Sequence, residues 1–149
     1  MFQNKVVVIT GAAGGIEKCI HAEFEKAGAK VCIIDIADNP YFVGDIGDES
    51  VLRRFAAKVI SEYGRVDCLI NNAPPLFKGV SECSYEEFNY ALRVGVSAAF
   101  LLTQLFLPYF TSGASVINIS SSRDRMSQPQ SESYSAAKGG ISALTHALA

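Results

Sequence analysis

The sequence predicts an α/β fold: a doubly wound parallel sheet with helices on both faces. Short β-branched runs alternate with longer segments whose apolar residues recur at helical spacing, and a glycine-rich turn follows the first run. The chain has 149 residues, of which 49% are hydrophobic. This length suits one domain, residues 1–149, and no internal repeat or linker divides it.

The first part of the chain is expected to form a strand, a helix and a second strand. Val6–Thr10 is a β-branched run typical of a buried parallel strand. Apolar residues over 16–27 keep helical spacing until a glycine ends the pattern, and residues 31–34 resume a strand. The next extended piece, residues 41–43, follows too soon for the usual parallel crossover of about a dozen residues. We therefore expect no covering helix there.

The second part continues the alternation. An amphipathic pattern predicts a helix over 51–63, and the apolar run 66–70 predicts a buried strand. Residues 85–110 predict a helix with possible breaks, 115–119 the last strand, and a final helix begins near Ser133. In such a sheet, ligands bind at the carboxyl ends of the strands.

Charge and hydropathy narrow the class of partner. The formal net charge is -2 and no long cluster of Lys or Arg is present, which argues against nucleic acid or an anionic membrane. The apolar stretch 94–110 is interrupted by polar residues, so a buried helix is expected rather than a membrane span. No secretory signal is visible, and a cytoplasmic location is expected.

No metal site and no disulfide framework are predicted. The cysteines contain no C-x-x-C pair and are expected to be buried, reduced thiols; they are Cys19, Cys32, Cys68 and Cys83. His21 and His146 lack partners at metal-ligand spacing.

The pattern Y-S-A-A-K places a tyrosine and a lysine on one helix face. Tyr134 and Lys138 are four residues apart, and Ser121 lies thirteen positions before Tyr134. A nearby ammonium favours the phenolate over the phenol, which makes an acid/base tyrosine plausible. The alternative for Ser121 is a strand-end hydroxyl bonded to local backbone.

A second group of residues predicts a dinucleotide site. The turn after the first strand supplies Gly11, Gly14, Gly15 and Ile16, which allow a diphosphate to approach helix amides closely. Asp35 ends the second strand 20 positions after Gly15, where a carboxylate can bind an adenosine ribose. Because it would repel a 2'-phosphate, NAD is favoured over NADP.

Six motifs in this order resemble the short-chain dehydrogenase/reductase family. They are T-G-x-x-x-G-I, Asp35, Asp45 with Ile46, Asn71-Asn72-Ala73, Ser121 and Y-x-x-x-K. The resemblance covers essentially the whole chain. It implies a Rossmann-type fold and hydride transfer between a nicotinamide cofactor and an alcohol or carbonyl carbon.

The resemblance also implies a role for each matching residue. Tyr134 would be the general acid/base, Lys138 would favour its ionised form and hold the nicotinamide ribose, and Ser121 would orient the substrate oxygen. Asp45 would contact the adenine. Ile46, Asn72 and Ala73 would complete the cofactor site.

Four features depart from the family's pattern. Glu17 replaces a loop glycine and would repel a diphosphate. Pro74 replaces the glycine of N-N-A-G and removes an N–H. Gly95 aligns with a catalytic asparagine. Family domains also continue well beyond the Tyr/Lys helix, so we expect a fragment or a reduced relative, whose last strand near Val116 exposes an unpaired edge.

The expected function is therefore an NAD-dependent oxidoreductase acting on a small alcohol or carbonyl substrate. The alternative is a catalytically silent nucleotide-binding or oligomerising module, motivated by Glu17, Gly95 and the missing carboxyl-terminal third. By the same resemblance, the helix over 96–107 and the final helix are expected to pair between subunits of a homodimer or homotetramer. The residues that would select the substrate cannot be identified from this chain.

Overall fold

A computed structural model describes residues 2–11 and 15–149 of the protein, the side chains of residues 15–18 excepted. The strands are β1 (Val6–Thr10), β2 (Lys30–Asp35), β3 (Phe42–Val43), β4 (Val66–Asn71) and β5 (Phe110–Asn118). The main helices are α1 (Gly15–Lys26), α2 (Glu49–Tyr63), α3 (Tyr85–Leu92), α4 (Ala98–Phe106) and α5 (Glu132–Leu148). Three short helices, η1 (Arg93–Ser97), η2 (Leu107–Tyr109) and η3 (Ser122–Asp124), complete the order.

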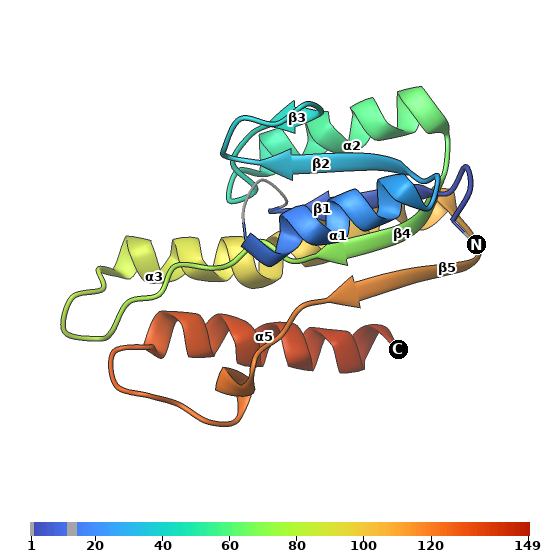
Figure 1. Cartoon of the computed structure of the whole chain (residues 1–149). Coiled ribbons are helices and arrows are strands. Elements are labelled where there is room, and N and C mark those ends of the chain that lie inside the picture. Colours follow the sequence, from blue (N-terminus) through green and yellow to red (C-terminus); the bar gives the residue numbers. More distant parts are fainter. Residues whose placement is uncertain (1, 12–14) are drawn as a thin grey trace.

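The strands form one parallel sheet in the order β3-β2-β1-β4-β5 (Figure 1). β1 lies at the centre, with Val8 opposite Cys32 of β2 and Leu69 of β4. The sequence order therefore turns back at β1, which is the topology of a Rossmann-type sheet. The predicted α/β class and doubly wound architecture are confirmed.

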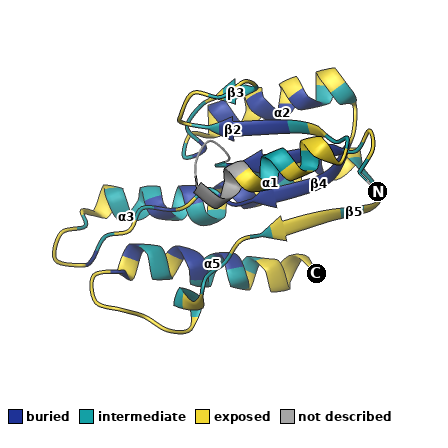
Figure 2. Cartoon of the chain, in the orientation of Figure 1, coloured by how far each residue is buried: buried dark blue, intermediate teal, exposed yellow. Residues whose placement is uncertain are grey.

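Two apolar cores lie on opposite faces of the sheet. On one face, residues such as Val8 and Leu69 pack with Phe55 of α2 and Leu102 of α4. On the other face, a smaller set including Ile9 packs with α1 residues. Alternate strand residues point to alternate faces, so the central strands are buried throughout and appear dark blue in Figure 2.

The crossover from β2 to β3 has no helix, as the short spacing predicts. Residues 36–41 are instead held by the side chain of Asn39. Its amide donates to the carbonyls of Ala37 (3.1 Å) and Phe42 (2.9 Å), and its oxygen accepts from the N–H groups of Tyr41 (3.0 Å) and Phe42 (2.9 Å). One amide thus satisfies the backbone groups that a helix would have paired internally.

The predicted long helix is confirmed, with a break. The π-helical turn η1 separates α3 from α4, and η2 ends the run at Tyr109. By length and composition, Tyr85–Tyr109 is the one described helix that could span a membrane. Leu102 and Phe106 are fully buried against the sheet, whereas only 28% of the most apolar window of the helix is buried. The expectation of a buried helix therefore holds for one face only.

β5 forms the edge of the sheet farthest from β3. β5 begins at Phe110, five residues earlier than predicted, because Phe110 already pairs with Val66 of β4. A register shift separates this pair from the next one, Ser115 with Cys68. β5 is largely exposed (Figure 2), and in this five-stranded sheet its outer edge has no strand beside it. This agrees with the open edge expected near Val116.

The four cysteines are free. Cys32 and Cys68 are buried as expected, but Cys19 is exposed and Cys83 is half-buried. The prediction was wrong for these two because neither lies in a buried strand.

Candidate active site

The carboxyl ends of β1 and β4 are joined by side-chain hydrogen bonds. The buried Thr10 hydroxyl accepts from the backbone N–H groups of Asn72 (3.0 Å) and Ala73 (3.2 Å). The Asn72 amide donates to the carbonyls of Thr10 and Gly11, both at 3.1 Å. Gly11 has a φ of 72°, and a Cβ there would lie 2.5 Å from Ala73 Cα, so a glycine is required. The side chain of Asn72, predicted to contact the cofactor, thus binds the end of β1.

A cavity of about 430 Å³ lies beside this junction, within the size range of ligand sites. Of the residues predicted to bind the cofactor, Gly11, Asp35, Asp45, Ile46 and Ala73 line it. Pro74, noted in the sequence as a departure from N-N-A-G, also lines the cavity. The lining residues that sequence reasoning missed are Ile34, Ile36, Ala37, Gly44, Tyr90 and Val94. Tyr90 and Val94 have the four-residue spacing of one helix face, but spacing alone does not show which face meets the sheet edge.

The outer wall of the cavity is acidic and apolar. Asp35 ends β2, and its Oδ1 accepts from the N–H of Ala37 at 2.9 Å. The next residue, Ile36, is 70% exposed at the rim. None of the described residues that line the cavity is Lys or Arg. The described lining of the cavity therefore offers no cation to an extra phosphate near Asp35.

The predicted diphosphate contacts fall mostly outside the described part of the chain. Gly14 lies outside the described residues, and only the backbone of Gly15 and Ile16, at the start of α1, is described. The side chain of Glu17 is also outside the described set. These assignments stay predictions.

Tyr134 and Lys138 lie one turn apart in α5, as predicted. Lys138 Nζ lies 5.6 Å from the centre of the Tyr134 ring and donates to the Ile119 carbonyl at 2.6 Å. Lys138 is only 5% exposed, and burial lowers the pKa of its ammonium below the ordinary value. A single buried cation is therefore fixed between the tyrosine ring and the segment that follows β5.

The serine segment is docked along the same helix. Ser120 Oγ donates to the Lys138 carbonyl at 3.1 Å and lies 2.7 Å from Ser142 Oγ. Ser121 Oγ accepts from the Arg123 N–H at 3.2 Å, which is the local backbone contact of the alternative interpretation. In the described part of the chain, no hydrogen bond joins Ser121 to Tyr134. The structure thus brings the segment of Ser121 against α5 and leaves its catalytic role a prediction.

A loop after β4 covers the start of α5 beside Tyr134. The fully buried Ser133 hydroxyl contacts the carbonyls of Leu76 (2.8 Å) and Lys78 (3.0 Å) and accepts from the Lys78 N–H (2.9 Å). These bonds flank Phe77, whose ring lies 5.3 Å from that of Tyr134. One serine therefore fixes an aromatic side chain against the predicted acid/base residue, a contact that sequence reasoning missed.

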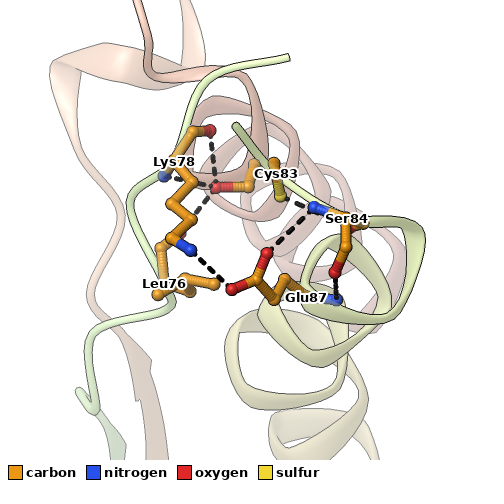
Figure 3. A network of polar contacts seen from close by, with 6 residues as sticks. Leu76, Lys78, Cys83, Ser84 and Glu87 are labelled. Atoms are coloured by element: carbon orange, nitrogen blue, oxygen red, sulfur yellow. Dashed lines mark hydrogen bonds and ion pairs between the residues drawn. The ribbon is translucent and has the colours of Figure 1, made fainter. Parts of the chain in front are cut away.

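The same loop is tied to α3, as Figure 3 shows. Lys78 Nζ lies 2.5 Å from Glu87 Oε1, and this ammonium lowers the pKa of Glu87 to about 2. Glu87 also accepts from the N–H of Ser84, whose hydroxyl accepts from the Glu87 N–H. This capping box ends the loop and starts the helix at the same point.

Gly95 leaves no room for the asparagine expected by resemblance. A Cβ at this position would lie 2.7 Å from the Ala137 Cβ and 3.2 Å from the Pro75 Cβ. Ala137 lies in α5 next to Lys138, and it occupies the space that a side chain at position 95 of η1 would need. The departure is therefore built into the packing of the site.

The chain belongs to the short-chain dehydrogenase/reductase family: the family model described as short chain dehydrogenase matches residues 5–149. An L-fucose dehydrogenase from Bos taurus is 33% identical over 99% of this chain and 60% of its own length. The structure of an apo SCOR enzyme from Clostridium thermocellum is 40% identical, with a TM-score of 0.91 over 98% of this chain and 66% of that one.

A second related structure holds a nicotinamide cofactor. It is a 3-ketoacyl-(acyl-carrier-protein) reductase from Brucella melitensis complexed with NADH, 28% identical, with a TM-score of 0.85 over 99% of this chain and 69% of that one. The chain spans 60% of the length of the L-fucose dehydrogenase and 66% of the length of an uncharacterized oxidoreductase from Thermotoga maritima that it also matches. The matched part of the family's domain contains the cavity and the Tyr134–Lys138 pair.

Proposed function

We propose that this chain forms the cofactor-binding and acid/base site of an NAD-dependent oxidoreductase that acts on a small alcohol or carbonyl substrate. One observation carries the proposal: the buried Lys138 lies against Tyr134 in α5 and lines a small pocket that adjoins the cavity at the ends of β1 and β4. The pocket and the cavity share the lining residues Ile46, Ala73 and Val94. NAD, when bound, supplies the hydride chemistry. The residues supply position and proton transfer.

Each of the three residues has a distinct task in this proposal. The Tyr134 hydroxyl gives a proton to the substrate oxygen in reduction and takes it back in oxidation. The Lys138 ammonium stabilises the phenolate that remains. It is buried and donates to one carbonyl, that of Ile119, so no described carboxylate competes for its charge. The Ser121 hydroxyl, which accepts one backbone N–H, can still donate its own hydrogen to the substrate oxygen.

The choice of NAD rests on the charge of the cavity wall. Asp35 stands where the adenosine ribose would bind, and Ile36 and Ala37 follow it without a cation. A carboxylate accepts hydrogen bonds from a ribose 2'-hydroxyl but repels a 2'-phosphate. The described cavity therefore supports NAD over NADP.

The test separates binding from catalysis. Because the chain has no Trp, the emission of bound NADH can be titrated with little background from the protein. We expect saturable NADH binding, weaker NADPH binding, and turnover of an alcohol panel that falls by a factor of about 100 or more in Tyr134→Phe. NADH binding should be retained in that variant. Full turnover in Tyr134→Phe would exclude the acid/base role.

Gly95 supports a second candidate, a catalytically silent nucleotide-binding or oligomerising module. The family's asparagine is absent, and the close approach of Ala137 leaves no space for it. This candidate predicts NADH binding with no oxidation of any alcohol. Gly95→Asn is expected to displace α5 instead of restoring turnover, so the wild-type chain itself is the decisive sample.

A further inference from the structure

We propose that Tyr90 is a cofactor-positioning residue whose hydroxyl fixes the carboxylate of Asp45. The fixed carboxylate selects adenine, which carries a 6-amino group, over hypoxanthine, which carries a 6-oxo group. This inference rests on the proposed function and goes beyond it. It assigns a task to a side chain of α3 that no motif of the sequence indicated.

The first step is the conformation of Asp45. It follows the short strand β3, and its Oδ1 accepts from the N–H of Gly47 at 2.7 Å. The chain then turns, with the N–H of Asp48 directed to the Asp45 carbonyl at 3.2 Å. This turn holds one carboxylate oxygen in place from its own side of the cavity.

The second step is the contact from α3. The Tyr90 hydroxyl donates to the same Oδ1 of Asp45 at 3.0 Å. Its ring packs over Gly47, where an added Cβ would lie 2.6 Å from Tyr90 Cε2. The glycine thus allows the ring to approach, and Asp45 Oδ1 receives donors from both elements.

The third step is the place of this pair in the cavity. Asp45, Tyr90 and Val94 all line the cavity of about 430 Å³ that also contains Asp35 and Gly11. Among the described residues, both hydrogen bonds of the Asp45 side chain use Oδ1. Oδ2 is left to accept from a ligand.

The chemistry of the ligand follows from that acceptor. An ionised carboxylate only accepts hydrogen bonds. The 6-amino group of adenine can donate to it, whereas the 6-oxo group of hypoxanthine cannot and would be repelled. Because Tyr90 and Gly47 fix Oδ1, the carboxylate cannot rotate freely to relieve this repulsion. Base selectivity should therefore depend on the tyrosine hydroxyl, not only on the carboxylate.

The experiment compares NADH with its hypoxanthine analogue, deamino-NADH, by equilibrium titration of the purified chain. The wild type should bind NADH more tightly by a factor of about 10 or more, the range of one hydrogen bond to a charged group. Tyr90→Phe should lower NADH affinity by a factor of about 5. Deamino-NADH affinity should stay the same or rise, because the freed carboxylate can rotate away from the 6-oxo group, so the ratio falls. Asp45→Asn, whose amide can donate to the 6-oxo group, should abolish or reverse the ratio.

Tyr85→Phe is the matched control, because this tyrosine of the same helix is 83% exposed and outside the cavity lining. It should leave both affinities unchanged, and circular dichroism should show all variants folded. If Tyr90→Phe lowers stability but keeps the wild-type ratio, Tyr90 is only a structural contact and the inference is overturned. If the wild type binds both dinucleotides equally, adenine selection by Asp45 is wrong while dinucleotide binding stands. Binding of neither would overturn the proposed function as well.

Discussion

At the scale of single residues, Asp67 shows how a buried charge is stabilised far from the candidate site. It lies at the start of β4 with its side chain only 6% exposed. Its carboxylate accepts from Arg65, Lys5, the backbone N–H of Val6 and the Thr111 hydroxyl, at 2.6 to 3.0 Å. Burial alone would raise the pKa of Asp67, but these donors outweigh burial and hold the pKa well below its ordinary value.

The low pKa of Asp67 predicts a loss of stability in acid. The unfolded carboxyl titrates near 3.9, so the folded chain binds this proton less readily than the unfolded chain does. The stabilisation is complete above about pH 5 and decreases as the pH falls below the unfolded value. Asp67→Asn should lower the unfolding free energy at neutral pH by about 2 kcal/mol and flatten its acid dependence. Denaturant titrations between pH 3 and about 7 measure both effects.

Asp38→Asn is the control for that series, since Asp38 is exposed. It should change neither the unfolding free energy nor its pH profile by more than about 0.5 kcal/mol. An Asp67→Asn profile parallel to the wild-type profile would contradict the prediction.

Residues of the candidate site were predictable where a contiguous motif carries the chemistry. Asp35 and Asp45 line the cavity, and Lys138 lies against Tyr134, as the motifs indicate. Tyr90 and Phe77 were not predictable, because their roles depend on tertiary contacts made across more than forty residues of sequence. From sequence alone, a tyrosine or phenylalanine in a partly apolar segment is assigned to the core.

At the scale of elements, the loop after β4 and the start of α5 behave as one unit. Gly79 lies so close to Gln130 that an added Cβ would be 2.5 Å from the Gln130 Cα. The Val80 N–H donates to Glu132 at 3.1 Å, and Ser133 binds backbone groups on both sides of Phe77. The wall beside Tyr134 therefore depends on a small set of polar contacts.

Ser133→Ala should loosen this unit. The variant leaves the N–H of Lys78 and the two carbonyls without their buried partner, at a cost of about 1 to 3 kcal/mol in unfolding free energy. Amide hydrogen exchange over 76–80 should become faster than in the wild type. Ser61→Ala, on the exposed face of α2, is the control and should alter neither quantity. Unchanged exchange in Ser133→Ala would show that the loop is held by other contacts.

The order and type of elements followed from periodicity, whereas two boundaries did not. The beginning of β5 could not be placed from the sequence, because the polar run Thr111, Ser112 and Gly113 has no strand pattern. The run lies at the register shift between the Phe110–Val66 and Ser115–Cys68 pairs. The π-helical turn η1 continues the apolar pattern of its neighbours, so periodicity predicts one helix with breaks and cannot place them. Both features depend on tertiary contacts, since η1 packs against Ala137 of α5 and Phe110 pairs with Val66 of β4.

At the scale of the whole molecule, the outer side of α4 and η2 exposes several large apolar side chains. On α4 and η2, Phe100, Leu107 and Tyr109 are 49%, 66% and 36% exposed. Exposed apolar residues that share one surface commonly mark contacts between chains. The outer side of the α3–α4 helix has the composition of an interface, and we expect it to pair with the same surface of a second copy.

Replacement of one of these residues tests the pairing. The wild type should elute with a mass of at least twice the 16.0 kDa chain in size-exclusion chromatography with light scattering. Phe100→Glu should move the protein toward 16.0 kDa, because two such carboxylates would be brought together and desolvated in a symmetric interface. Val80→Glu adds the same charge at an 81% exposed loop position and should leave the mass unchanged. A wild type of 16.0 kDa would show that the chain does not pair. A Phe100→Glu variant that stays oligomeric would place the contact on another surface.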